Sequence, residues 1–154
     1  MPEDKRNIYK IAREARGLTQ EAAAEKLGIS DSSIRAYETG QRIPPLDVVD
    51  LMVDAYDSQL LGIQHIRASA EMARSIVPDV QELSLSTAIA NFLDCIYSFV
   101  DNHRDRSLLH IGKDGMIDEQ ESPVFDDISE ELDQLAAAAM AVRFAKRKNR
   151  KEII

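Results

Sequence analysis

A run of polar side chains at residues 30–36 has the residue types and spacing for molecular recognition. It holds three hydroxyls, a carboxylate and a guanidinium: Ser30, Asp31, Ser32, Ser33 and Arg35. At helical spacing, Asp31, Ser32 and Arg35 share one face and Ile34 lies on the other. Such groups on an exposed helix can hydrogen-bond base edges and phosphates. The run is therefore a candidate surface for binding a nucleic acid.

Two short helices around a tight connection must position this run. We expect the Thr19 hydroxyl to cap a helix that ends at Gly28, and Ser30 to cap the next helix, which ends near Gly40. Tyr37 falls on the apolar stripe of that second helix, so we assign it to the core. A three-residue connection containing glycine is typical of helix pairs that place their second helix in the major groove.

Residues 15–45, ARGLTQEAAAEKLGISDSSIRAYETGQRIPP, resemble the phage repressor and Cro-type (Xre-like) helix-turn-helix family of transcriptional regulators. The resemblance covers about residues 5–58. Four motifs carry it in order, namely RGLTQ at 16–20, KLGIS at 26–30, SIRAYE at 33–38 and GQRIP at 40–44. It implies a five-helix-type DNA-binding domain.

The resemblance also implies roles for individual residues. Gln20 would contact a backbone phosphate and support the recognition helix, and Arg13 would pair with Glu38 as part of the scaffold. The implied DNA-binding set is Thr19, Gln20, Ser30, Asp31, Ser32, Ser33, Arg35, Ala36 and Arg42. Of these, Asp31, Ser32 and Ala36 would touch bases, and Ser33, Arg35 and Arg42 would lie near phosphates or flanking bases.

Two residues depart from the commoner pattern of this family. Asp31 stands where many relatives have Arg, Lys or Gln; its carboxylate can accept from cytosine N4 but repels phosphate. Ala36 offers only an apolar contact, such as one to a thymine methyl. Arg35 becomes the best candidate for a strong contact, either to a base or to a phosphate.

The distribution of charge bears on a DNA partner. The 154 residues carry a net charge of -8, but residues 1–45 stand at +1, residues 46–60 at -4 and residues 61–154 at -5. The deficit therefore lies away from the proposed recognition helix. A basic tail at 143–151 is interpreted first as a solvated helix end. The alternatives are a second phosphate contact and an interaction with the acidic stretch at 114–133.

Other chemistry is not indicated. The single cysteine, Cys95, excludes an intrachain disulfide framework, and His65, His103 and His110 lack metal-ligand spacing. Residues 110–121 resemble a calcium loop but have His110 and Gly112 where carboxylates should stand. We therefore expect no cofactor, no metal, no membrane span and no enzymatic activity, in a cytoplasmic protein.

Apolar residues recur at helical spacing almost throughout, so the predicted fold class is all-α. We expect a DNA-binding domain over 1–60 and a helical oligomerisation domain over 61–154, with helices near 64–76, 85–102 and 125–142. The apolar 85–99 face and the 125–142 seam exceed what a helical hairpin easily hides, which favours a homodimer through 80–145.

The predicted function is a sequence-specific regulator of transcription, a repressor acting as a homodimer on a partly palindromic operator. The alternative is an antitoxin-like or ligand-sensing regulator whose carboxy-terminal helices bind a protein partner and whose DNA binding is autoregulatory.

Overall fold

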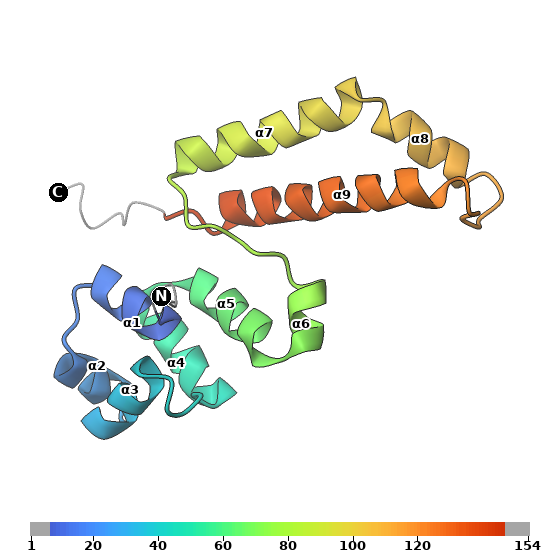
Figure 1. Cartoon of the computed structure of the whole chain (residues 1–154). Coiled ribbons are helices and arrows are strands. Elements are labelled where there is room, and N and C mark those ends of the chain that lie inside the picture. Colours follow the sequence, from blue (N-terminus) through green and yellow to red (C-terminus); the bar gives the residue numbers. More distant parts are fainter. Residues whose placement is uncertain (1–6, 147–154) are drawn as a thin grey trace, which may run out of the picture. The chain divides into compact units, whose positions relative to one another are not determined.

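The computed structural model of the chain describes residues 7–146, and the regular structure in this range is entirely helical (Figure 1). The all-α prediction is confirmed. The helices are α1 (Ile8–Ala15), α2 (Gln20–Leu27), α3 (Asp31–Glu38), α4 (Leu46–Tyr56), α5 (Gln59–Ser69), α6 (Glu71–Ile76), α7 (Leu85–Asp101), α8 (Arg104–Ile111) and α9 (Ser122–Arg143). They form two compact units that divide between Val77 and Pro78.

The predicted caps define α2 and α3. The Thr19 hydroxyl accepts a hydrogen bond from the backbone N–H of Ala22 at 3.1 Å, and α2 ends at Gly28 in the left-handed conformation, with φ 66°. The Ser30 hydroxyl accepts from the N–H of Ser33 at 3.2 Å. Both caps satisfy donors that a helix start leaves unpaired, which fixes the turn between the two helices.

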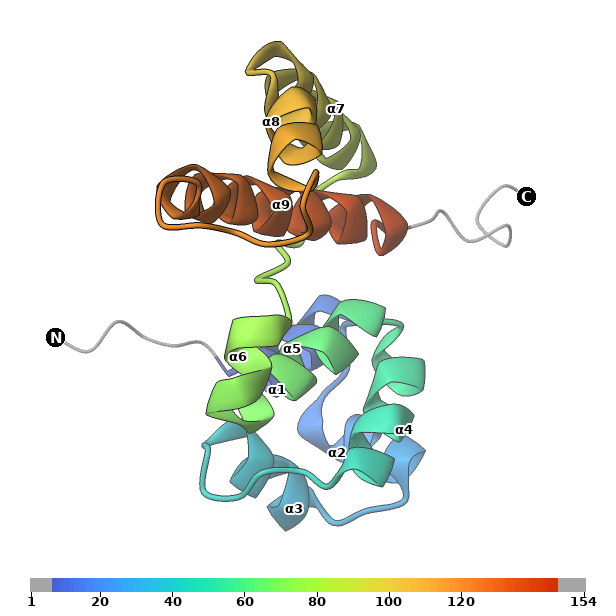
Figure 2. The same cartoon turned by 90° about the vertical axis from the view of Figure 1, so that its right-hand side faces the viewer.

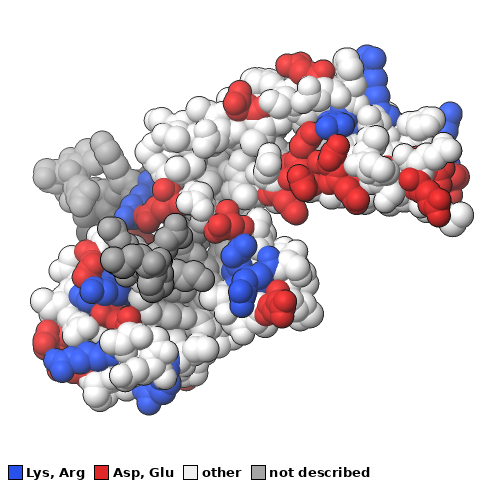
Figure 3. Space-filling view, in the orientation of Figure 1, with Lys and Arg blue, Asp and Glu red and all other residues white. Residues whose placement is uncertain are grey.

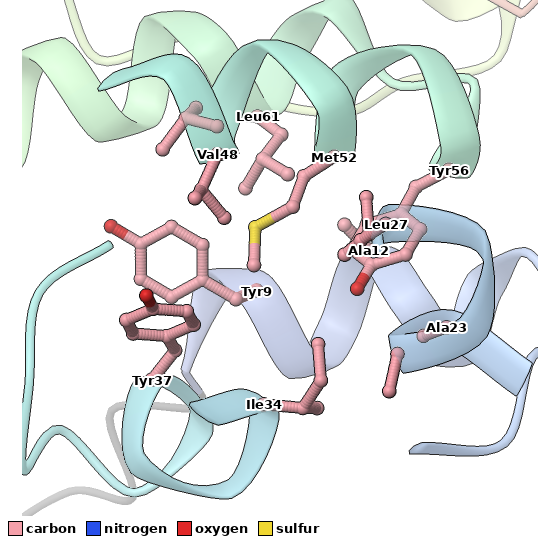
Figure 4. Packing of buried hydrophobic residues seen from close by; sticks show 12 residues of the cluster. Tyr9, Ala12, Ala23, Leu27, Ile34, Tyr37, Val48, Met52, Tyr56 and Leu61 are labelled. Carbon is pink, nitrogen blue, oxygen red and sulfur yellow. The ribbon is translucent and has the colours of Figure 1, made fainter. Parts of the chain in front are cut away.

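The core of the first unit gathers side chains from α1 to α5 (Figure 4). Ile34 and Tyr37 of α3 are buried there, as the sequence predicted for Tyr37. The helical spacing of apolar residues predicts that Ile8, Ile11, Ala12 and Ala15 form the buried face of α1. This is wrong in part, because Ile11 is 40% exposed and Ala15 is also exposed. Tyr9, Ala12 and Arg13 form the buried face of α1 instead. The apolar pattern misplaced this face because one of its members is a charged residue.

The first unit extends past the predicted boundary between residues 60 and 61, which falls inside α5. Leu60 and Leu61 of α5 are buried, and α5 packs against α1 and α4. The single helix predicted over 64–76 is two helices, α5 and α6, separated by Ala70 in an extended conformation. The guanidinium of Arg67 donates to the carbonyl of Val77 at 3.2 Å, which ties the end of this segment to α5.

The second unit is an antiparallel pair of long helices, α7 and α9, connected through α8 (Figures 1 and 2). The helices predicted near 85–102 and 125–142 correspond to α7 and α9. Helix α8 was not predicted, because residues 101–115 are polar and contain glycines. Arg104 at its start pairs with Glu131 of α9 at 2.8 Å. This ion pair and the buried Ile111 hold α8 in the unit.

Glu121 is the last residue of the segment that resembles a calcium loop, and it stands just before α9. Its carboxylate accepts a hydrogen bond from the backbone N–H of Asp118 at 3.2 Å. Within residues 7–146, no group of His, Cys, Asp or Glu side chains has the arrangement of a metal site. No helix in that range has both the length and the apolar character needed to cross a membrane.

Candidate nucleic-acid interface

Helix α3 presents its amino-terminal half to solvent. Asp31, Ser32 and Arg35 are exposed, Ser33 and Ala36 are half-buried, and Ile34, Tyr37 and Glu38 are buried. The apolar residues fix the rotation of the helix about its axis because they occupy the core of the first unit. The polar face predicted from the sequence is therefore the face left free for a ligand.

The hydroxyls at the start of α3 hold one another in place. The Ser30 hydroxyl lies 2.9 Å from that of Ser32 and 3.0 Å from that of Ser33. Ser33 also accepts a hydrogen bond from Arg42 at 2.9 Å, so it supports the loop that follows α3. Ser32 is exposed, and the Ser30 hydroxyl is the one hydrogen-bond partner of its side chain among the described residues.

Arg13 and Glu38 form the ion pair implied by the resemblance. The guanidinium Nε lies 2.5 Å from Oε1 of Glu38, and the second nitrogen, Nη2, lies 3.0 Å from Oε2. Arg13 also donates to the carbonyl of Leu18 at 2.6 Å. The hydrogen bond with Glu38 raises the pKa of Arg13 above its ordinary value, against the opposing effect of burial. The pair joins α1 to the last residue of α3.

Gln20 extends this buried pair to the surface of α3. Its side-chain amide donates to Oε2 of Glu38 at 2.9 Å, and its carbonyl oxygen accepts from Nε of Arg35 at 3.4 Å. Since the carboxylate of Glu38 accepts only, the amide orientation is fixed by this bond. The structure therefore brings together Arg13, Glu38, Gln20 and Arg35, and this chain of contacts positions Arg35.

Arg42 lies against the carboxy-terminal half of α3. Its guanidinium stands 5.0 Å from the centre of the Tyr37 ring, an arrangement in which cation and π electrons attract. The backbone N–H of Arg42 donates to the carbonyl of Ala36 at 3.1 Å. Together with the bond to Ser33, these contacts hold an exposed positive charge beside the recognition helix.

The remaining residues of the predicted set lie at the edges of this surface. Thr19 is exposed at the start of α2, where its hydroxyl acts as a cap. Asp31 is exposed in the first turn of α3, where the helix dipole favours an acid. Positive and negative side chains are interspersed over the first unit in the view of Figure 3, so this domain lacks a strongly basic face there.

Sequence reasoning missed two supports of this surface. The side-chain oxygen of Asn7 caps α1, and its amide donates to the carbonyl of Tyr37 at 2.8 Å. Asparagine just before a helical pattern is a usual capping signal, so this role could have been found. The buried hydroxyl of Tyr9 lies 2.8 Å from Nδ1 of His65. The two residues are 56 positions apart in the sequence, and no local pattern signals their contact.

The basic tail predicted at 143–151 is described only in part. Arg143 is the last residue of α9, and Lys146 pairs with Glu82 at 3.1 Å on the surface of the second unit. Residues 147–151 lie outside the described residues. A phosphate contact by this tail stays a prediction.

Comparison with known proteins agrees with this geometry. A family profile described as helix-turn-helix matches residues 10–63, from α1 into α5. The chain is also 44% identical over 45 residues to the uncharacterized HTH-type transcriptional regulator YobD of Bacillus subtilis (strain 168). This alignment covers 29% of the chain and spans 40% of the length of YobD. No solved structure matches the chain significantly.

Proposed function

Residues 10–63 form a helix-turn-helix domain of the repressor and Cro type, and from this premise we propose that the chain is a sequence-specific, DNA-binding regulator of transcription. The observation that carries the proposal is the exposed polar face of α3, held in place by the buried Arg13–Glu38 pair through Gln20. A rigid recognition helix is what base readout requires. This function requires a location in the cytoplasm, where prokaryotic DNA lies.

In the proposed complex, the amino-terminal half of α3 enters the major groove. Ser32 and Asp31 would face base edges, with Asp31 accepting from cytosine N4. Arg35 would contact a guanine or a phosphate, and Ala36 would lie against a thymine methyl. Gln20 at the start of α2 would touch the backbone while it holds Arg35, so one side chain would couple phosphate positioning to base readout.

The contacts nearer the ends of the two helices would set the register on the duplex. Thr19 and Ser30 stand at the amino ends of α2 and α3, where backbone N–H groups and the helix dipole favour phosphate. Ser33 and Arg42 form a bonded pair at 2.9 Å, and Arg42 would supply positive charge to a flanking phosphate. These contacts would supply affinity without sequence information.

A single domain of this size reads only a short half-site, about four base pairs, and neutralises few phosphates. Two copies would double the number of base pairs that are read and the number of phosphates that are neutralised. We therefore include in the proposal a homodimer that places two α3 helices in successive major grooves of a partly palindromic operator. Repression would follow from occupancy of the operator, because bound protein blocks the polymerase.

Selection of duplexes from a random pool tests this function. Full-length protein is expected to enrich one partly palindromic sequence, and a gel shift is expected to favour that duplex over a scrambled one at least roughly a thousandfold. Failure to enrich any sequence at low salt would contradict DNA recognition. A reporter gene under the selected operator then separates repression from activation by the sign of the change in expression.

A further inference from the structure

The apolar surface of helix α7 is wider than the face that α9 covers. On a helical projection of about 100° per residue, its apolar side chains span about 200°. One flank carries the fully buried Ala88 and the half-buried Cys95, and Cys95 lines a shallow groove with Ala138 and Ala141 of α9. This flank is therefore the one packed on α9.

The other flank of α7 is uncovered. We call it the outer stripe, and it consists of five side chains that are 39–60% exposed: Leu85, Ile89, Leu93, Tyr97 and Val100. Their spacing of four, four, four and three residues places them on one face of the helix. The stripe contains no charged residue, and the surface over α7 is largely uncharged in Figure 3.

The second unit needs this additional burial. Among residues 78–146, the buried apolar side chains are Val80, Ala88, Ile111, Ile128 and Ala141, and two of the five are alanines. The first unit has thirteen such side chains over a similar length. A helical hairpin with so small a core gains little from hydrophobic burial, so covering the outer stripe would supply a large part of its stability.

We propose that the outer stripe is the seam of a homodimer, covered by the outer stripe of a second copy in antiparallel orientation. Leu93 lies eight residues after Leu85 and seven before Val100, so it sits near the centre. A two-fold axis at Leu93 would place Leu85 of one copy against Val100 of the other and Ile89 against Tyr97. The stripe is thus nearly symmetric about its centre, as a self-complementary interface requires.

Charge and area favour a second copy as the occupant. An uncharged stripe gives no pairing with a charged partner and no repulsion between copies. Antiparallel helices also bring opposite ends of their dipoles together. If a large side chain exposes on the order of 200 Å² in an extended chain, these five present about 500 Å² per copy. That is over half of the roughly 800 Å² per partner in a typical stable interface.

This interface is narrower than the one predicted from the sequence over 80–145. The 85–99 face and the 125–142 seam pack partly on each other within one chain, since α7 and α9 form the hairpin. The outer stripe is the apolar part of α7 that this packing leaves uncovered. The inference rests on the proposed function only in that a two-fold operator calls for a dimer.

Disulfide cross-linking of the full chain tests the proposed axis. In a Cys95→Ala background, Leu93→Cys is expected to form a covalent dimer upon mild oxidation, because cysteines at a two-fold axis come within bonding distance. The matched control is Ser98→Cys, which is exposed on the opposite side of α7 and is expected to form no covalent dimer. Equal cross-linking of both variants, or of Ser98→Cys alone, would overturn the proposal.

The orientation is tested with mixed single-cysteine proteins in the same background. Antiparallel pairing predicts that Leu85→Cys cross-links to Val100→Cys in a mixture, and that neither cross-links efficiently to itself. A parallel seam predicts the reverse. That result would overturn the antiparallel arrangement, because each position would then meet its own copy.

Sedimentation equilibrium supplies a measurement independent of cysteine chemistry. Leu93→Asp is expected to raise the dimer dissociation constant at least roughly thirtyfold, because it places two carboxylates in an apolar seam. Ser98→Asp, at the exposed position on the opposite side of α7, is the control and is expected to change it little. Circular dichroism checks that both variants remain helical. A wild-type chain that is monomeric at micromolar concentration, or one that binds a different protein through the stripe and excludes its own copy, would overturn the proposal.

Gel shifts in parallel separate this inference from the proposed function. If Leu93→Asp is monomeric and loses cooperative binding to the selected operator, both stand. If the wild type dimerises through the stripe but enriches no duplex, the DNA-binding proposal fails and the seam remains. If it enriches a palindrome while Leu93→Asp stays dimeric, the seam is wrong and the DNA-binding proposal remains.

Discussion

Glu38 accepts hydrogen bonds from two nitrogens of Arg13, so the last residue of α3 is tied to α1 by a pair of buried charges. The side chains are only 8% and 4% exposed. A buried pair of this kind costs desolvation energy and contributes little net stability over apolar packing. The pair instead fixes the distance between α1 and the end of α3. Gln20 is hydrogen-bonded to both Glu38 and Arg35, so the position of Arg35 depends on this pair.

Replacing one member of this pair should be costly. Glu38→Gln removes the negative charge and leaves the Arg13 guanidinium without its buried counterion, so the free energy of unfolding of the first unit should fall by about 3–5 kcal/mol. Urea denaturation followed by circular dichroism measures the change. The double variant Arg13→Met, Glu38→Leu should recover most of the loss, since neither buried charge remains.

Glu14→Gln is the matched control. Glu14 lies 3.9 Å from the same guanidinium, but its side chain is 57% exposed and solvent screens the interaction. Its loss should change the free energy of unfolding by less than about 0.5 kcal/mol. Similar effects of Glu14→Gln and Glu38→Gln would contradict the argument that burial makes the Arg13–Glu38 pair sensitive.

Gln20 should act on DNA through Arg35. Gln20→Ala removes the acceptor that holds Nε of Arg35, so the affinity for the selected operator should fall about tenfold, the worth of a hydrogen bond to a charged group. Gln59→Ala, exposed at the start of α5, is the control and should bind normally. In an Arg35→Ala background, Gln20→Ala should cost less, because only its own contact to the DNA backbone is then lost. Fully additive losses in this double-mutant cycle would show that Gln20 does not work through Arg35.

The sequence predicted the first unit well because its signals are local. Thr19, Gly28 and Ser30 act within one turn of their own position, so the two caps and the tight connection between α2 and α3 were found. The polar face of α3 followed from helical spacing alone. The Arg13–Glu38 pair was implied by the family resemblance, since its members are 25 residues apart.

The predictions from the sequence failed where contacts between distant residues determine the structure. Arg13 is buried because Glu38 and the carbonyl of Leu18 receive it, so apolar periodicity pointed to Ile11 instead. The first unit continues through α5 because Leu60 and Leu61 are buried in it, a tertiary contact that the local sequence does not reveal. Helix α8 has few apolar residues, so its sequence gives only a weak helical pattern. The ion pair of Arg104 with Glu131 helps to hold this helix, and the local sequence does not reveal that pair.

The carboxylate of Asp31 should weaken binding to DNA in general. Asp31→Asn removes one phosphate-repelling charge per copy, so the affinity for scrambled DNA should rise about three- to tenfold at low salt. The same change should lower the stability by about 0.3–1 kcal/mol, because an acid at the start of α3 is favoured by the helix dipole. Gel shifts and urea denaturation follow the two effects. Asp47→Asn, in the first turn of α4, is the control; an equal gain in affinity there would point to net charge alone.

Binding should depend only modestly on salt. If Arg35 and Arg42 are the cations that each copy places on phosphates, the logarithm of the dimer's association constant should fall against the logarithm of salt concentration with a slope of about -4. Titrations between low and moderate salt measure it. A much steeper slope would implicate the basic tail at 143–151. Removing residues 147–154 should then restore the shallow dependence.

Acid should weaken the first unit through His65. Burial lowers the pKa of this side chain below its ordinary value, and its Nδ1 lies 2.8 Å from the buried hydroxyl of Tyr9. The unfolded chain, with a histidine pKa of about 6.5, therefore binds a proton before the folded chain does. Stability from the neutral ring is present above about pH 6.5 and is lost as the pH falls toward the lowered folded-state pKa. His65→Phe should unfold more easily at pH 7.5 yet lose less stability between pH 7.5 and 5.0 than the wild type. The exposed His103→Gln should keep the wild-type pH dependence. An unchanged dependence in His65→Phe would assign the acid sensitivity to other groups.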